Sequence, residues 1–264
     1  MRIAVIGHIE WVTHGRAPFI PAAGQIVHLT DPLDEPAGGG AVSAVGLVRM
    51  GAEVSFYTAL GSDGLSAPIL TSLGVTVLGA QRAARQTRAV TMTDPSGERT
   101  IVVAGPNLHP TADDPLPWDE LGSFDGVYFT GLDPRTLRAA RAAPVLVVTA
   151  RRFETLVESG VRVDALVGSR TDPGEQFDLS RLAAQPDHIV VTDGRRGGTG
   201  YDPVDPPGPV VDAYGAGDTF VAGVTYGLAA GWPLPEALRF AATQAAEVVT
   251  WRGAYPRPDG EHGW

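Results

Sequence analysis

The sequence contains no cysteine and no lysine. Without cysteine there is no disulfide, no thiolate zinc site, no iron–sulfur cluster and no cysteine nucleophile. Without lysine there is no Walker A loop, no protein-kinase phosphate lysine and no Schiff-base lysine. Asparagine occurs once, at Asn107, so any motif that needs a second asparagine must fail here.

Positive charge and long apolar runs are also scarce. The formal net charge of −10 disfavours DNA or RNA as a partner, and it disfavours an anionic membrane surface. No segment reaches the roughly 18 apolar residues of a membrane helix, and the apolar stretch 1–7 is too short for a signal peptide core. We therefore expect a cytoplasmic protein without nucleic-acid or membrane partners.

The 264 residues show the alternation of short apolar runs and longer helical stretches that is typical of a parallel α/β sheet. Buried strands are predicted over 3–6, 54–58, 126–129, 145–149, 165–167 and 189–192. Helices are predicted over 40–50, 134–142, 153–159, 179–184, 216–230 and 234–250.

Two regions break this rhythm, residues 16–35 and 87–105, which lack helical periodicity and contain turn residues. The second predicts a hairpin with strands over 89–92 and 99–103 and a turn at Asp94-Pro95-Ser96-Gly97. Two such insertions could pair into a small sheet over the mouth of a cleft. The Pro- and Gly-containing end, residues 255–264, is expected to fray.

Residues 209–223 carry the most chemical information. An extended apolar stretch ends in a turn containing Gly215 and Gly217, and a helix follows. The free N–H groups at the start of a helix attract anions, and glycines let a ligand approach the backbone closely. Asp218 lies in that first turn. It is either a helix-stabilising carboxylate or the base that takes a proton from a hydroxyl attacking a bound phosphate, and the local pattern leaves both interpretations open.

Asp-Ala-Tyr-Gly-Ala-Gly-Asp-Thr-Phe, over residues 212–220, resembles the C-terminal signature of the ribokinase-like (PfkB) carbohydrate kinases, Asp-Thr-x-Gly-Ala-Gly-Asp-x-Phe. The likeness extends over nearly the whole chain in the right order. It includes residues 36–40, 50–54, 59–64, 94–99, 190–194, 238–241 and 252–254.

The resemblance implies a role for each matching residue. Asp218 would be the general base, beside an anion hole formed by Gly215, Ala216 and Gly217. The other implied roles are nucleotide binding by Thr192, Gly194 and Gly197, substrate binding by Glu10, Gly38, Gly39 and Ser43, and metal binding by Asp172 and Asp212.

The resemblance also implies an architecture and cofactors. The fold would be a three-layer ribokinase-like α/β sandwich with a central, mostly parallel sheet, formed by one domain over residues 1–264. Residues 10–35 and 87–105 would form a small β lid, which in several relatives is also a dimer surface. The cofactors would be ATP and Mg²⁺, with a monovalent cation as a further option.

The departures from the family pattern concern the acceptor and the metal. Val12 stands where an Asp commonly binds substrate hydroxyls, and Ser43 stands near the position of an expected Asn. The family's Asn-x-x-Glu corresponds to residues 169–172, which end in Asp172. His8, Glu10, Trp11 and His14 offer a different set of polar and stacking groups, so the identity of the acceptor stays open.

Three functions compete at this point. The first is an ATP-dependent kinase for a sugar, nucleoside or similar alcohol. The second is a degenerate family member that binds nucleotide or sugar without efficient turnover, which the missing asparagines favour and the intact Gly215–Asp218 segment opposes. The third, a dinucleotide-dependent oxidoreductase, is set aside because Gly7 at the end of the first strand lacks the glycines that should follow it.

Overall fold

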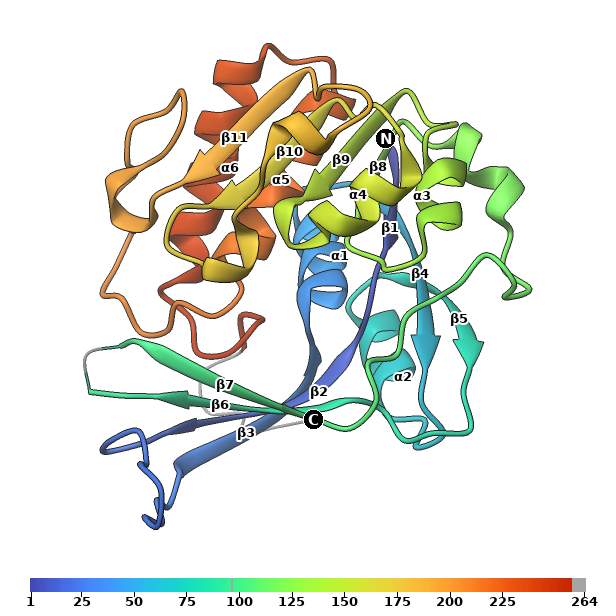
Figure 1. The fold of residues 1–264 in the computed structure, drawn as a ribbon. Helices are drawn as coiled ribbons and strands as arrows, with labels where there is room; N and C mark the ends of the chain where they lie inside the picture. The colour runs from blue at the N-terminus through green and yellow to red at the C-terminus, as the bar shows by residue number, and fades with distance from the viewer. Residues whose placement is uncertain (96, 258–264) are drawn as a thin grey trace.

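Two β-sheets organise the computed structural model, which describes residues 1–95 and 97–257 (Figure 1). All strand pairs of the larger sheet are parallel. Its spatial order is β11 (His188–Thr192), β10 (Ala165–Ser169), β9 (Val145–Thr149), β8 (Gly126–Phe129), β1 (Arg2–Ile6), β4 (Glu53–Leu60) and β5 (Thr76–Gln81).

Helices cover both faces of this sheet. They are α1 (Gly39–Arg49), α2 (Ser66–Ser72), α3 (Pro134–Ala140), α4 (Phe153–Ser159), α5 (Ala216–Ala229) and α6 (Leu234–Val248). Short 3₁₀ turns lie at Trp118–Ser123, Ala150–Arg152, Pro173–Glu175, Leu179–Arg181 and Gly194–Arg196. In the described part of the chain, no helix has both the length and the apolar character needed to span a bilayer.

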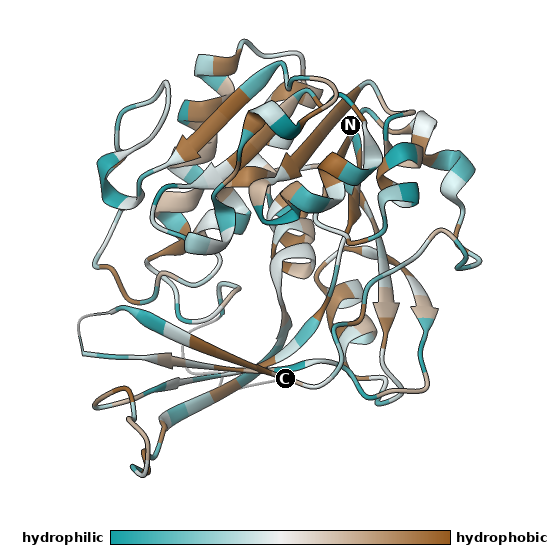
Figure 2. Cartoon of the chain, viewed as in Figure 1, coloured by the Kyte–Doolittle hydropathy of each residue, from teal (hydrophilic) through white to brown (hydrophobic). Residues whose placement is uncertain are grey.

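The three layers follow from side chains that alternate along each strand. In β1, Ile3 and Val5 join the core cluster that includes residues of α1, α5 and α6. Ala4 and Ile6 join the cluster on the other face, with residues of α3 and α4. All four are fully buried. Figure 2 shows the resulting pattern, with apolar strands in the middle and polar helix surfaces outside.

The smaller sheet lies below the first in Figure 1 and forms the predicted lid. Its order is β3 (Thr30–Ala37), β2 (Glu10–Arg16), β6 (Arg88–Thr93) and β7 (Arg99–Ala104). Strands β2 and β3 pair antiparallel, as do β6 and β7, whereas β2 and β6 run parallel. The lid therefore joins two segments that are far apart in the sequence.

The predicted fold class is confirmed, with local corrections. The helix expected over 179–184 is only the 3₁₀ turn Leu179–Arg181, because the following residues are partly exposed and no apolar face holds a longer helix. Helix α2 and strand β5 were not predicted. The tail is ordered at Tyr255, which is buried and donates its hydroxyl to the Pro36 carbonyl at 2.7 Å. Residues 258–264 of the predicted tail, and Ser96 of the predicted turn, lie outside the described residues.

Candidate active site

The N-terminus of α5 forms an open anion site. Gly215 caps the helix with a φ of 78°, a left-handed conformation that glycine adopts without steric cost. The N–H groups of Gly217 and Asp218 lie in the first turn, where a helix offers them no partner. Gly217 is exposed, and no atom lies within 4 Å of the position that a side chain there would take. An anion can therefore approach these amides closely.

The Asp218 carboxylate lies against the start of α1. A Cβ on Gly39 would stand 3.0 Å from Asp218 Oδ1, so glycine leaves the space that the carboxylate occupies. Burial raises the pKa of Asp218, while the guanidinium groups of Arg99 and Arg151 oppose that rise. A half-buried carboxylate with a raised pKa, beside an anion site, has the properties of a general base.

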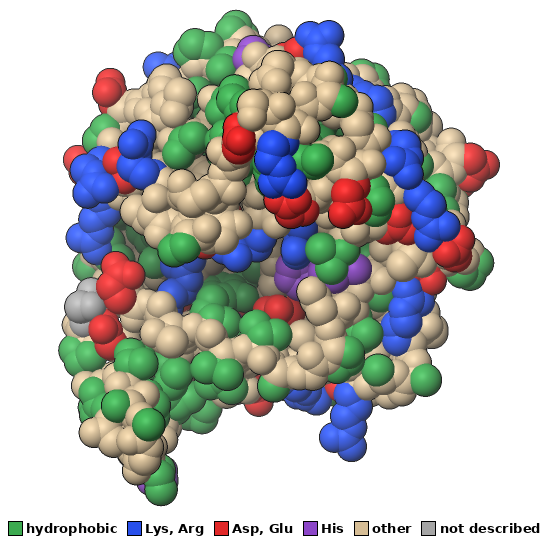
Figure 3. Space-filling model, viewed as in Figure 1, with side chains coloured by type: hydrophobic (Ala, Val, Ile, Leu, Met, Phe, Trp, Pro, Cys, Tyr) green, Lys and Arg blue, Asp and Glu red, His purple; other side chains and the backbone are tan. Residues whose placement is uncertain are grey.

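The chain after β1, the start of β2 and the segment after β7 supply further polar groups on this side of the molecule. Glu10 Oε1 lies 3.8 Å from His8 Nε2, and the His8 ring lies 4.9 Å from the ring of His109, centroid to centroid. Burial raises the pKa of Glu10, and the nearby charge of Asp218 raises it further. Glu10 and Asp218 thus line the same space. Figure 3 shows a hollow between the two sheets, with Arg, His and acidic side chains along it.

One direct contact joins the lid to the loop that leads into α5. The Arg99 guanidinium, from β7, donates to the carbonyl of Ala213 at 2.9 Å. Ala213 belongs to the loop that leads into α5, so the contact joins the lid to the anion site. Trp11 follows Glu10 in β2, so its side chain lies on the opposite face of that strand. The Arg88 guanidinium lies 5.7 Å from the centre of the Trp11 ring.

The residues predicted to bind nucleotide lie at the same edge of the large sheet, after β11. Thr192 is the last residue of that strand and pairs with Gly198 in an isolated bridge. Gly194 and Gly197 have φ values of 55° and 84°, which shape the turn between them. A side chain on Gly197 would approach Pro203 N to 2.8 Å, so this turn needs glycine.

The predicted metal ligands have different surroundings. Asp172 forms an ion pair with Arg151 and accepts a hydrogen bond from the Gly174 N–H at 2.8 Å. Asp212 is buried, and its two oxygens accept from the N–H groups of Tyr214 at 2.9 Å and Gly253 at 3.3 Å. These bonds hold the signature loop, and metal binding by Asp212 stays a prediction.

Glu175 is an acidic residue of the site that the sequence analysis missed. Burial raises its pKa, Arg151 lowers it, and the charges of Asp172 and Asp218 raise it again, with a net pKa of about 7. Its Oε1 lies 3.5 Å from Arg151 Nε. Glu175 lies three residues beyond the position where the family spacing places a Glu, and no local pattern marked it.

Ser43, in α1, contacts the backbone of Asp218. It is fully buried, and its hydroxyl donates to the Asp218 backbone carbonyl at 3.0 Å. Its direct role in the structure is to fasten α1 to the first turn of α5. Contact between Ser43 and a substrate stays a prediction.

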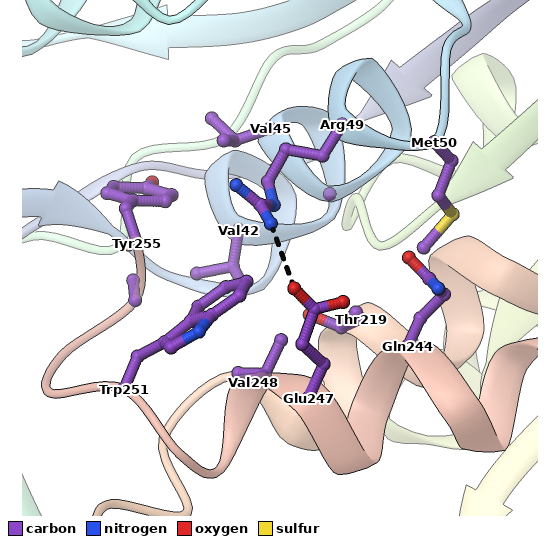
Figure 4. A pocket seen from close by; sticks show the side chains of 12 residues that line it. Val42, Val45, Arg49, Met50, Thr219, Gln244, Glu247, Val248, Trp251 and Tyr255 are labelled. Atoms are coloured by element: carbon purple, nitrogen blue, oxygen red, sulfur yellow. Dashed lines mark hydrogen bonds and ion pairs between the residues drawn. The ribbon is translucent and has the colours of Figure 1, made fainter. Parts of the chain in front are cut away.

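A shallow pocket lies between α1 and α6 (Figure 4). Arg49 Nη2 donates to Glu247 Oε1 at 3.4 Å, and the Arg49 guanidinium lies 4.4 Å from the ring centre of Trp251. The pocket contains none of the predicted site residues. These contacts hold α6 against α1. Helix α5 packs against both of them.

Comparison with known proteins agrees with this geometry. The model of the pfkB family carbohydrate kinases matches residues 2–192 and 178–259, which is almost the whole chain. The chain belongs to the PfkB family of carbohydrate kinases. The second matched range, residues 178–259, includes the Gly215–Asp218 segment.

Individual relatives are more distant. A 5-dehydro-2-deoxygluconokinase of Geobacillus thermodenitrificans is 28% identical over 112 residues, which are 34% of this chain and 32% of that protein. An acarbose 7(IV)-phosphotransferase of Actinoplanes sp. is 42% identical over 72 residues, 24% of each chain. These alignments span a third or less of the relatives' length.

Solved structures agree with the fold over the full length. A ribokinase from Cryptococcus neoformans in complex with ADP has a TM-score of 0.75 at 20% identity, covering 96% of this chain and 95% of that one. An adenosine kinase from Sinorhizobium meliloti has a TM-score of 0.77 at 17% identity, covering 96% and 95%. At these identities the likeness establishes the fold alone.

The contact between Gly39 and Asp218 leads to a prediction for this PfkB protein. Gly39→Ala is expected to lower kcat by about 10- to 100-fold, because the new methyl group must displace the carboxylate and misplaced catalytic groups cost such factors. Gly46→Ala on the same helix is the control, since its Cβ would make an ordinary 3.7 Å contact with Ala222. Steady-state kinetics and melting temperatures of both variants test this. An unchanged kcat for Gly39→Ala would show that the carboxylate needs no such space.

Proposed function

We propose that this protein transfers the γ-phosphate of ATP to a hydroxyl group of a sugar, a nucleoside or a similar small alcohol. The observation that carries the proposal is the Asp218 carboxylate with its raised pKa, next to the free amides of the first turn of α5 and facing the hollow under the lid. Family membership supports it. The named relatives differ in their acceptors, so their names do not select one for this chain.

In the proposed reaction, Asp218 takes the proton of the acceptor hydroxyl as its oxygen attacks the γ-phosphorus. The bond from the γ-phosphorus to the bridging oxygen breaks, and ADP leaves. The N–H groups of Gly217 and Asp218 stabilise the charge on the transferred group, while the turn Gly194–Gly197 lies along the nucleotide. Arg99 keeps the lid closed and limits the access of water.

Magnesium is the expected cofactor, and its fit can be judged from the carboxylates. The described residues contain no group of three or more His, Asp or Glu side chains that could hold a metal ion by themselves. Mg²⁺ needs only one or two protein carboxylates, because it keeps several waters and binds the phosphates. Glu175 and Asp172, on either side of Arg151, meet that need. When bound, the ion would neutralise phosphate charge.

An ADP-release screen over sugars and nucleosides, with ATP and Mg²⁺, tests the proposed function. We expect acceptor-dependent ADP formation for at least one class of alcohol. The second candidate is a non-catalytic binding protein, which the missing asparagines favour. Nucleotide binding by calorimetry without acceptor-dependent ADP release would support that candidate and overturn the kinase proposal.

We also propose that the lid pairs with the lid of a second copy. Strand β7 is an edge strand, and Ile101, Val102 and Val103 on it are 43%, 53% and 54% exposed. Exposed apolar edges favour association. Light scattering on the intact chain should give a dimer, and Val102→Glu should give a monomer. A monomeric wild-type chain at micromolar concentration would contradict this pairing.

A further inference from the structure

The floor of the hollow contains an anchored guanidinium group, that of Arg152. Its Nε donates to the carbonyl of Thr130 at 2.8 Å, which fixes the side chain at the carboxyl ends of β8 and β9. Among the residues that the structure describes, none accepts a hydrogen bond from its terminal nitrogens or forms an ion pair with it. The neighbouring Arg151 differs, because it is held by Asp172 and Glu175.

The groups around Arg152 belong to the lid side of the hollow. The positive charge of Arg152 acts on His8, His109 and Glu10, which follow β1 or precede the lid. The pKa of Asp218 is raised by burial, and Arg99 and Arg151 are the cations that oppose this rise. Thr130, which anchors Arg152, packs against Gly7, the residue before His8, so the guanidinium lies beside the polar groups that follow β1.

The two histidines beside Arg152 add no positive charge. Burial, followed by neighbouring positive charge, lowers the pKa of His8 to about 3 and that of His109 to about 2, so both rings are neutral at pH 7. Their Nδ1 atoms are buried without a hydrogen-bond partner. His109 Nε2 lies 3.0 Å from Asn107 Oδ1, which accepts only if that nitrogen carries the proton.

We propose that the phosphate acceptor carries an anionic oxyacid group, a carboxylate or a phosphate, which the terminal N–H groups of Arg152 bind while a hydroxyl of the same molecule lies at Asp218. A partly buried guanidinium whose terminal N–H groups have no acceptor is costly, and a planar oxyanion satisfies two of these N–H groups at once. The neutral rings of His8 and His109 leave Arg152 as the positive charge of this group. This inference rests on the proposed kinase function.

The test compares matched acceptors that differ only in the anionic group. One arm pairs sugars with the corresponding uronic acids, and the other pairs sugars with their terminal phosphate esters. We expect the anionic member of one arm to have a kcat/KM about 10- to 100-fold higher, as expected for one bidentate charged contact. The preferred arm identifies the group as carboxylate or phosphate.

Variants then assign this preference to the guanidinium. Arg152→Gln is expected to raise KM for the anionic acceptor by about 10- to 100-fold while the KM for ATP changes little. Arg152→Lys should restore part of the loss, because it keeps the charge but not the fork. Arg138→Gln is the matched control, since its guanidinium also donates to carbonyls, those of Glu158 and Ser159.

Two results would overturn the inference and leave the kinase function intact. One is equal turnover of neutral and anionic acceptors. The other is a loss of kcat in Arg152→Gln that is the same for both classes, which would place Arg152 on the transferred phosphoryl group. If no acceptor of either class is phosphorylated, the proposed function fails. Calorimetric binding of the anionic acceptors to wild type and Arg152→Gln then decides this inference separately: binding that is lost in the variant supports it, and binding that is equal or absent overturns it.

Discussion

Asp218→Asn is expected to lower kcat by about 10²- to 10⁴-fold, the range that a positioned general base contributes. The amide keeps the shape of the carboxylate but cannot accept the proton of the acceptor hydroxyl. The KM for ATP should change little, because the amides of the α5 N-terminus remain. Steady-state kinetics with the acceptor found in the screen measure the effect.

The stability of Asp218→Asn distinguishes a catalytic role of Asp218 from a role in stabilising the start of α5. Because burial raises the pKa of Asp218, the folded state prefers the protonated form, and stability is lost as pH rises from the unfolded pKa to the folded one. Above that window, Asp218→Asn should melt at the same or a higher temperature than wild type. Activity of the wild type should fall as pH drops through the raised pKa. Asp133→Asn, at the N-cap of α3, is the control and should keep full activity. A fully active Asp218→Asn would leave Asp218 as an acidic residue of the first turn of α5 without a catalytic role.

Glu35→Ala is expected to destabilise the protein by about 3–5 kcal/mol, the usual cost of removing one partner from a buried ion pair. Glu35 is fully buried in β3 and lies 3.0 Å from His14 Nε2. It also accepts hydrogen bonds from the Ala254 N–H and the Arg257 guanidinium, both at 2.6 Å. Loss of the carboxylate therefore loosens the lid from the C-terminal segment. Urea unfolding measures the change in free energy.

The pH dependence of that loss has a defined sign. Burial by itself would raise the pKa of Glu35, but the interactions with His14, Ala254 and Arg257 outweigh it and lower the pKa. The stabilisation is therefore complete above the ordinary pKa of a glutamate and disappears as pH falls through the lowered value. Asp34→Ala, at the residue directly before Glu35, is the control, since the Asp34 side chain is exposed. Equal unfolding free energies for wild type and Glu35→Ala at pH 7 would contradict this account.

The central strands could be predicted because each is a short apolar run buried on both faces. The predicted ranges 126–129 and 145–149 coincide with β8 and β9. Strand β5 escaped prediction because it lies at the sheet edge, where Val77 and Leu78 are only half-buried and the apolar signal is weak. Pairing of the two insertions was expected, but the parallel direction and register of β2 with β6 depend on contacts across more than seventy residues, which local patterns do not encode.

The site was predictable where a compact motif fixes the backbone. Gly215–Asp218 form a helix start with a left-handed cap, as the spacing of small residues indicated. Arg99, His109 and Arg152 could not be found in this way. Each comes from a different segment, and each reaches the hollow only through the register of the lid or the order of the strands. Arginine and histidine are common on protein surfaces, so no local sequence pattern indicates that these three residues line the hollow.

The most direct test of the account is to follow the phosphorus itself. Wild-type protein, ATP, Mg²⁺ and the acceptor from the screen are monitored by ³¹P NMR, with Asp218→Asn in parallel. The account predicts ADP and an acceptor phosphomonoester in equal amounts with the wild type, and almost none of either with the variant. ADP accompanied only by inorganic phosphate, or the same phosphomonoester from the variant at the wild-type rate, would contradict it.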